Sequence, residues 1–141
     1  MIQEYLNSAS KSIPERVTEL LRLFEDDTML FEKRKLRLDH FREIKPMEFN
    51  IGNLRHGVIG RSNDSVWIVA FKTEPLTEEE ISAFSRECKK FRNKLQRKVI
   101  VVLKDPDSNA RLKAMEEKVW TWDVNNLNQF MDLYSRPRVI V

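Results

Sequence analysis

Residues of the types that most often perform catalysis or bind metals are few in this chain of 141 residues. Cys88 is the only cysteine, so neither an intrachain disulfide nor a zinc site of several cysteines can form. The two histidines, His40 and His56, lack the close spacing of an HxH or HExxH motif, and we expect neither to bind a metal. The three glycines are not spaced as in a phosphate-binding loop. Zinc-dependent and nucleotide-loop chemistry are therefore not predicted.

Basic residues form two clusters that could contact phosphate groups. The run 89–98 (KKFRNKLQRK) contains six basic residues and no acidic one, and 33–37 (KRKLR) is a shorter cluster. Cations near the end of a helix complement its dipole, so the longer run is interpreted first as a solvated helix end. The alternative is contact with a nucleic-acid backbone. The candidate contacts in this run are Lys89, Lys90, Arg92, Lys94 and Lys98.

The composition is that of a globular protein with a single domain over residues 1–141. Hydrophobic residues make up 41% and charged residues 33%, and the formal net charge of +3 permits nucleic-acid binding without requiring it. The longest apolar runs, Val66–Phe71 and Val99–Leu103, are far shorter than the roughly 18 residues that span a bilayer. We therefore expect no membrane partner and, because a lone cysteine suits a reducing compartment, a cytoplasmic location.

The first part of the chain is expected to contain one helix and one strand. Residues 12–25 begin with a capping-box pattern and continue with apolar residues at helical spacing, which predicts a helix. Residues 36–44 are predicted as a strand that ends at Lys45-Pro46. The segment 26–35 fits either a continuing helix or a loop, and both alternatives stay open.

A β-hairpin is the strongest local signal in the sequence. Apolar segments 54–60 and 66–73 flank the turn-rich stretch 61–65. A two-residue turn at Asn63-Asp64 would fix the register of the two strands.

That register brings together a small group of residues near the open end of the hairpin. Gly57 is paired with Ala70, Arg55 is paired with Lys72, and all four share one face. Lys72 is then either a strand-end lysine in solvent or, with Arg55, part of a shallow basic hollow that could hold a phosphate or another anion. The opposite face carries His56, Val58, Trp67, Val69 and Phe71, so both faces need a cover of helices or loops.

The rest of the chain alternates helices and strands. Thr77 and Glu80 have capping-box spacing, and the apolar stripe of the helix that they open includes Cys88, which we expect to be buried. A strand after that helix is expected to pair in parallel with 66–73. The predicted fold class is α/β, with a mixed sheet flanked by helices. The elements are a helix over 77–96, a strand over 99–103, a helix over 110–118, a strand over 119–122, a helix capped by Asp123 or Asn125, and an edge strand Val139–Val141.

The segment 56–73 (HGVIGRSNDSVWIVAFKT), with the following amphipathic helix and VIVVL at 99–103, resembles the restriction-endonuclease-like nucleases, the PD-(D/E)xK superfamily. The strand and helix at 119–134 are similar to the close of archaeal and bacterial members, so the resemblance covers roughly residues 12–134. It implies a core of a helix, a hairpin, a crossover helix and a further strand. The implied chemistry is phosphodiester hydrolysis, with carboxylates that hold Mg²⁺ and a lysine that helps to position water and phosphate.

Matched to this motif, the sequence keeps the lysine and lacks both acids. Lys72 occupies the lysine position, Gly57 the position of the first acid, and Ala70 that of the second. Neither side chain at the acid positions can bind a metal. The chain thus resembles an inactivated member, which is expected to act without a cofactor by binding DNA, RNA or a protein partner.

Two alternatives remain. In the first, the chain is an active Mg²⁺-dependent nuclease in which Glu80 or Glu87 supplies the second carboxylate beside Lys72. The first carboxylate would then come from Asp39, Glu43 or Glu48, among which no spacing decides. In the second, the chain is an assembly module in which Val139–Val141 pairs by strand addition with another copy.

Overall fold

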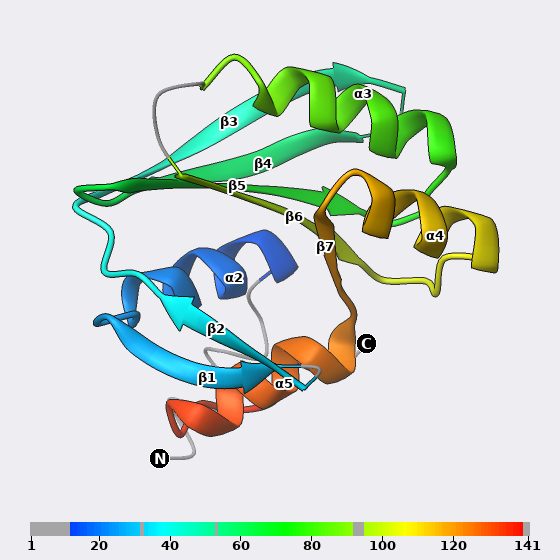
Figure 1. Ribbon diagram of the computed structural model, residues 1–141. Helices are drawn as coiled ribbons and strands as arrows, with labels where there is room; N and C mark the ends of the chain where they lie inside the picture. The colour runs from blue at the N-terminus through cyan, green and yellow to red at the C-terminus, as the bar shows by residue number, and fades with distance from the viewer. Residues whose placement is uncertain (1–11, 32, 53, 92–94, 140–141) are drawn as a thin grey trace.

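The computed structural model describes residues 12–31, 33–52, 54–91 and 95–139 (Figure 1). Helices and strands alternate in its second half, whereas five strands follow one another in its first half. In chain order the elements are α2 (Ile13–Arg22), β1 (Asp27–Phe31), β2 (Arg34–Leu38), β3 (Glu43–Ile51), β4 (Leu54–Arg61), β5 (Ser65–Lys72), α3 (Glu78–Cys88), β6 (Leu95–Val102), α4 (Ser108–Glu116), β7 (Val119–Trp122) and α5 (Val124–Leu133).

The centre of the fold is a mixed sheet of five strands in the order β3-β4-β5-β6-β7. Strands β3, β4 and β5 are antiparallel, whereas β5, β6 and β7 are parallel and are connected through α3 and α4. Helices α3 and α4 cover one face of the sheet, and α2, α5 and the β1–β2 hairpin cover the other (Figure 1). The prediction of a mixed α/β sheet flanked by helices is confirmed, and so is the parallel pairing of β5 with β6.

The predicted register of the β4–β5 hairpin is also confirmed. Gly57 pairs with Ala70, and the backbone N–H of Ser62 donates to the carbonyl of Ser65 at 3.0 Å, which closes a two-residue turn. The two turn residues adopt no positive φ. Strand pairing and burial of both faces therefore hold this register without a left-handed turn.

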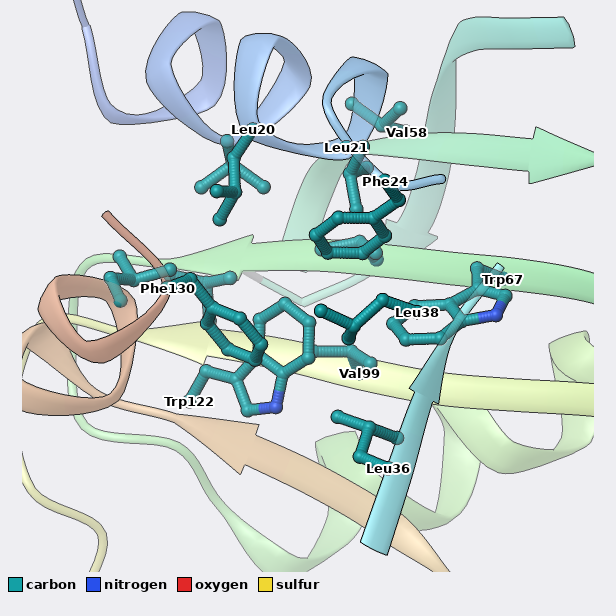
Figure 2. Close-up of a cluster of buried hydrophobic side chains, with 14 of the residues drawn as sticks. Leu20, Leu21, Phe24, Leu36, Leu38, Val58, Trp67, Val99, Trp122 and Phe130 are labelled. Carbon is teal, nitrogen blue, oxygen red and sulfur yellow. The ribbon is translucent and has the colours of Figure 1, made fainter. Parts of the chain in front are cut away.

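Alternation along the strands builds two separate cores. Trp67 and Val69 face α2, α5 and the β1–β2 hairpin, where aromatic rings such as Phe24, Trp122 and Phe130 gather (Figure 2). The residues of β5 that alternate with them face the other side and pack against α3 and α4. The buried residues of β5 on that second side are Val66, Ile68 and Ala70.

The prediction of one strand over residues 36–44 is wrong. Strand β2 ends at Leu38 and β3 begins at Glu43, so the segment between them is not a strand. Pro46 lies inside β3 rather than at its end. A proline that cannot donate a ladder hydrogen bond is tolerated there because β3 is an edge strand of the described sheet. The ambiguous segment 26–35 is neither a continuing helix nor a loop, but contains β1 and the start of β2.

The helix expected over 77–96 has the predicted beginning but ends earlier. Thr77 is the N-cap, and its capping box with Glu80 is formed in both directions. The helix stops at Cys88, and β6 begins at Leu95 because residues 95–98 extend the parallel ladder along the first half of β5. The run 89–98 is therefore not one solvated helix end, and its residues 92–94 lie outside the described residues.

The predicted order of helix, strand and helix after β6 is confirmed up to the end of α5. Asp123 caps this helix by accepting a hydrogen bond from the backbone N–H of Asn126 at 2.8 Å. The predicted strand Val139–Val141 falls partly on residues 140–141, which lie outside the described residues. At Val139, both the N–H and the carbonyl are hydrogen-bonded to the side chain of Asn128, so this residue has no backbone group ready for strand addition. Over the described parts of the chain, no helix is long and apolar enough to span a membrane.

Candidate functional site

Lys72 lies at the end of β5, on the same face as Ala70 and Gly57, against the first turn of α3. It is only 2% exposed, and its Nζ donates to Oε2 of Glu80 at 2.7 Å. Neither interpretation from the sequence is right, because Lys72 does not reach solvent and does not form a basic hollow with Arg55. The Arg55 side chain is exposed, and the β4–β5 ladder ends before it at the Gly57–Ala70 pair.

Glu80 holds Lys72 from the first turn of α3, and each of its carboxylate oxygens has a different role. Oε2 accepts from Lys72, while Oε1 accepts from the backbone N–H and the hydroxyl of Thr77, each at 3.1 Å. Gly52 in the β3–β4 turn lies above the pair, since a Cβ built on it would be 3.3 Å from Oε2. The ion pair is thus enclosed between this turn, the end of β5 and α3.

The Glu80 carboxyl group is ionised at neutral pH. Burial acts to raise the pKa of Glu80, but the hydrogen bonds from Lys72 and Thr77 outweigh it and hold this pKa below its ordinary value. The carboxylate therefore cancels the charge of the lysine inside the protein. A neutralised, enclosed lysine cannot position a phosphate at the surface.

The space beside Gly57, where the resemblance would place the first acid, is filled by an aromatic ring and a backbone carbonyl. A Cβ on Gly57 would lie 2.4 Å from the carbonyl oxygen of Val69 and 2.5 Å from the ring of Phe49. That ring packs edge-on against Phe84 with centroids 5.5 Å apart, so α3 holds it in place. Ala70, where the resemblance would place the second acid, is completely buried in the same apolar cluster.

The other candidate acids are separated from one another. Glu87 lies near the end of α3 and pairs with Lys90 at 2.9 Å, and Glu43 pairs with Lys45. Glu48, in β3, lies at a pocket beside α2, on the face opposite Lys72. In the described ranges, no three His, Cys, Asp or Glu side chains gather as a metal site would require. The residues around Lys72 therefore do not fit Mg²⁺, which proteins anchor through carboxylates.

Asp39, the remaining candidate acid, is buried in a hydrogen-bond network beneath the β4–β5 turn. Its Oδ2 accepts from the hydroxyl of Ser65 at 2.8 Å and from Nε1 of Trp67 at 3.0 Å. Its Oδ1 faces Nε of Arg37 at 3.1 Å. All of its contacts are with the protein's own donors, so Asp39 holds the turn on the core rather than a metal.

We expect Asp39→Ala to lower the free energy of unfolding by about 2–3 kcal/mol, because it leaves the buried Nε1 of Trp67 without its acceptor and removes one hydrogen-bond partner of the Ser65 hydroxyl. Urea denaturation measures this loss. Asp64→Ala removes an exposed carboxylate from the same turn and is expected to change stability little. Equal effects of the two substitutions would contradict the buried-network role.

Within the described part of the run 89–98, the candidate nucleic-acid contacts differ in their exposure. Lys98 is half-buried, and its Nζ donates to Oγ of Ser85 at 3.0 Å and to the carbonyl of Glu117. Lys90 pairs with Glu87, and Lys89 is exposed at the end of α3. Arg92 and Lys94 lie outside the described residues.

The shorter basic cluster has a different setting. All four of its cations are exposed on the β1–β2 hairpin, which the sequence did not predict. Arg34 lies over the ring of Trp120, 4.7 Å from its centroid. The cluster consists of Lys33, Arg34, Lys35 and Arg37.

The predicted burial of Cys88 is confirmed. Cys88 is buried, and burial raises the pKa of its thiol to about 12, so it is not a reactive nucleophile. Nδ1 of His40 lies 3.1 Å from the carbonyl oxygen of Phe24. His56 lines a pocket of about 530 Å³ between α2 and strands β3–β5, together with Glu15, Glu19 and Glu48. No sequence signal marks this hollow, because its walls come from segments that only tertiary packing brings together.

Comparison with models of known protein families finds none that matches this chain. Comparison with curated proteins gives no significant match either. The function is therefore argued from the geometry of the chain's own residues.

Proposed function

We propose that this chain is a restriction-endonuclease-like domain that has lost metal-dependent cleavage and acts by binding nucleic acid. The order of α2, the antiparallel strands β3–β5, α3 and the parallel strand β6 supports the proposal, since it agrees with the core that the sequence resemblance implies. Lys72 keeps the place of the lysine within that order.

The main observation in support of lost cleavage is that other groups fill the space at position 57, where the resemblance implies the first acid. The Phe49 ring and the Val69 carbonyl occupy the space that a side chain at position 57 needs. Without carboxylates at positions 57 and 70, this face of the sheet has no anchor for Mg²⁺, which gives up its water reluctantly. Hydrolysis then has neither an activated water nor a stabilised leaving oxygen.

The exposed basic cluster on the β1–β2 hairpin supports binding to nucleic acid rather than to an uncharged partner. Nonspecific affinity for nucleic acid arises mainly from cations that replace the counterions around phosphates. Such binding does not need the enclosed Lys72–Glu80 pair, so it can persist in a domain that no longer cleaves.

A specific contact also favours the alternative of an active nuclease. Glu80 is one of the two acids proposed to replace the missing second carboxylate, and it is in fact the partner of Lys72. Against that role, both of its oxygens are already bonded within the protein, and the pair is enclosed by the β3–β4 turn.

The proposal is tested by measuring cleavage and binding on the same nucleic acids. We expect no cleavage of plasmid DNA or single-stranded RNA above background with Mg²⁺ or Mn²⁺, because the ligand positions hold no carboxylate. We also expect binding to labelled DNA at ~50 mM salt that weakens steeply toward physiological salt. Mg²⁺-dependent cleavage by the unmodified protein would instead establish the active nuclease. Absence of any binding at ~50 mM salt would overturn the nucleic-acid role and favour a protein partner.

A further inference from the structure

The β1–β2 hairpin has one apolar side and one basic side. Phe31 in β1 and Leu36 and Leu38 in β2 are buried in the core that also contains Trp122 and Phe130. Because side chains alternate along a strand, the residues between them point away from the core. Those outward residues are Thr28 and Leu30 in β1 and Lys35 and Arg37 in β2, and Lys33 lies at the tip.

The buried side makes the hairpin a fixed platform rather than a mobile arm. The ring of Phe31 packs in a stacked arrangement against Phe130, with centroids 5.5 Å apart, and edge-on against Trp120 at the same separation. Arg34 also lies over the ring of Trp120, 4.7 Å from its centroid. The backbone that carries the cations is therefore held in position before a ligand arrives, which reduces the entropy lost on binding.

The outward side presents its charge to solvent. Lys33 and Lys35 form no ion pair with any carboxylate in the described stretches of the chain. Arg37 is braced by Asp26 at 3.3 Å and by Asp39 at 3.1 Å, but its side chain remains 58% exposed. Leu30, the cross-strand neighbour of Lys35, is 69% exposed and adds an apolar contact to the same side.

We propose that the outward side of this hairpin, which we call the ribbon surface (Thr28, Leu30, Lys33, Lys35 and Arg37), binds duplex nucleic acid through its phosphates. The inference rests on the proposed function and replaces the run 89–98 as the binding surface. Alternate residues of a strand are about 6.6 Å apart, so Lys35 and Arg37 in β2 can each contact a different phosphate, and Lys33 at the tip adds a third cation beside them. A two-stranded ribbon also has the width that the major groove of duplex DNA admits.

The test compares two double charge reversals of equal size. Lys33→Glu with Lys35→Glu alters the ribbon surface, and Lys89→Glu with Lys90→Glu alters the former candidate surface. All four lysines are exposed, so both variants are expected to fold, which thermal melting checks. Binding of a labelled DNA duplex is measured by fluorescence anisotropy over a series of salt concentrations, with a single strand of equal length in parallel.

We expect the ribbon variant to lose at least ~10-fold in duplex affinity, and the slope of log affinity against log salt to become shallower by about 2, since two phosphate contacts are lost. The Lys89/Lys90 variant should keep both the slope and most of the affinity. Equal losses in the two variants, or a loss confined to the Lys89/Lys90 variant, would overturn the ribbon surface while leaving nucleic-acid binding intact. Tighter binding of the single strand would overturn the duplex preference. Failure of the unmodified protein to bind either probe would instead overturn the proposed function itself.

Discussion

Glu80→Gln is expected to lower the free energy of unfolding by about 3–5 kcal/mol, because it leaves the charge of Lys72 buried without a partner. Glutamine keeps an oxygen that can accept from the Thr77 backbone, so the helix cap is not the main loss. The amide can present only a neutral oxygen or a donor to the ammonium group. Urea denaturation of the two proteins at neutral pH measures the difference.

Two further variants separate the ion pair from other effects. Glu79→Gln makes the same chemical change in the same helical turn, but at an exposed side chain, and is expected to fall within about 0.5 kcal/mol of the parent. Lys72→Met combined with Glu80→Gln removes the isolated charge and should recover much of the loss, since apolar replacements of buried ion pairs are often neutral. Equal effects of Glu79→Gln and Glu80→Gln would contradict the buried-pair account.

The same pair predicts a dependence on pH. The pKa of Glu80 is lower in the folded protein than in the unfolded chain, so the folded state binds this proton less readily. The contribution of the Glu80 carboxylate to folding stability is complete above the ordinary carboxyl pKa of about 4.3, and it is lost as pH falls through the lower pKa of the folded state. The stability difference between the parent and Glu80→Gln should therefore be constant near neutrality and narrow below about pH 4.

The sequence predicted best those features that depend on residues close together in the chain. The β4–β5 register follows from one short turn, and the beginning of α3 follows from one capping box, because both are fixed over a few residues. The sequence also named Glu80 as a possible partner of Lys72, although as part of a metal site. What it could not show is that the Gly52 turn encloses the pair and that Phe49 occupies the acid position.

Features that depend on distant partners were predicted wrongly. In the sequence, Phe91 and Leu95 continue the apolar stripe of the helix that begins at Thr77. In the structure, Leu95 instead pairs with Ser65 and begins β6. Backbone pairing along the whole of β5 therefore outweighs the local helical periodicity. The β1–β2 hairpin was not predicted, because its tip residue Lys33 adopts a φ of 67° without the glycine or asparagine that usually marks such a turn. The placement of the basic cluster on that hairpin was consequently missed as well.

Gly57→Asp is expected to unfold the domain rather than create a metal site. A Cβ there meets the Val69 carbonyl at 2.4 Å, and this backbone atom cannot move away without parting β4 from β5. Overpacking of this kind costs about 1–3 kcal/mol or more, and an unpaired buried carboxylate adds several kcal/mol. Gly57→Asp thus approaches the roughly 5–15 kcal/mol that stabilises a whole domain. The soluble fraction and the far-UV circular dichroism of the variant, with and without Mn²⁺, report the outcome.

Alanine substitutions test the steric part alone, in variants that are expected to fold. Gly57→Ala should cost about 3 kcal/mol, whereas Gly60→Ala should cost about 1 kcal/mol, because the nearest atoms at position 60 belong to the Phe41 ring, at 3.0 Å, and a side chain can give way. Adding Phe49→Leu to Gly57→Ala should relieve the contact with the ring but not the contact with the Val69 carbonyl, so recovery is expected to be partial. A Gly57→Asp protein that folds stably and gains stability from Mn²⁺ would show that the acid position is still open. That result would favour the active-nuclease alternative, because a single substitution would then have created a metal ligand near Lys72 and Glu80.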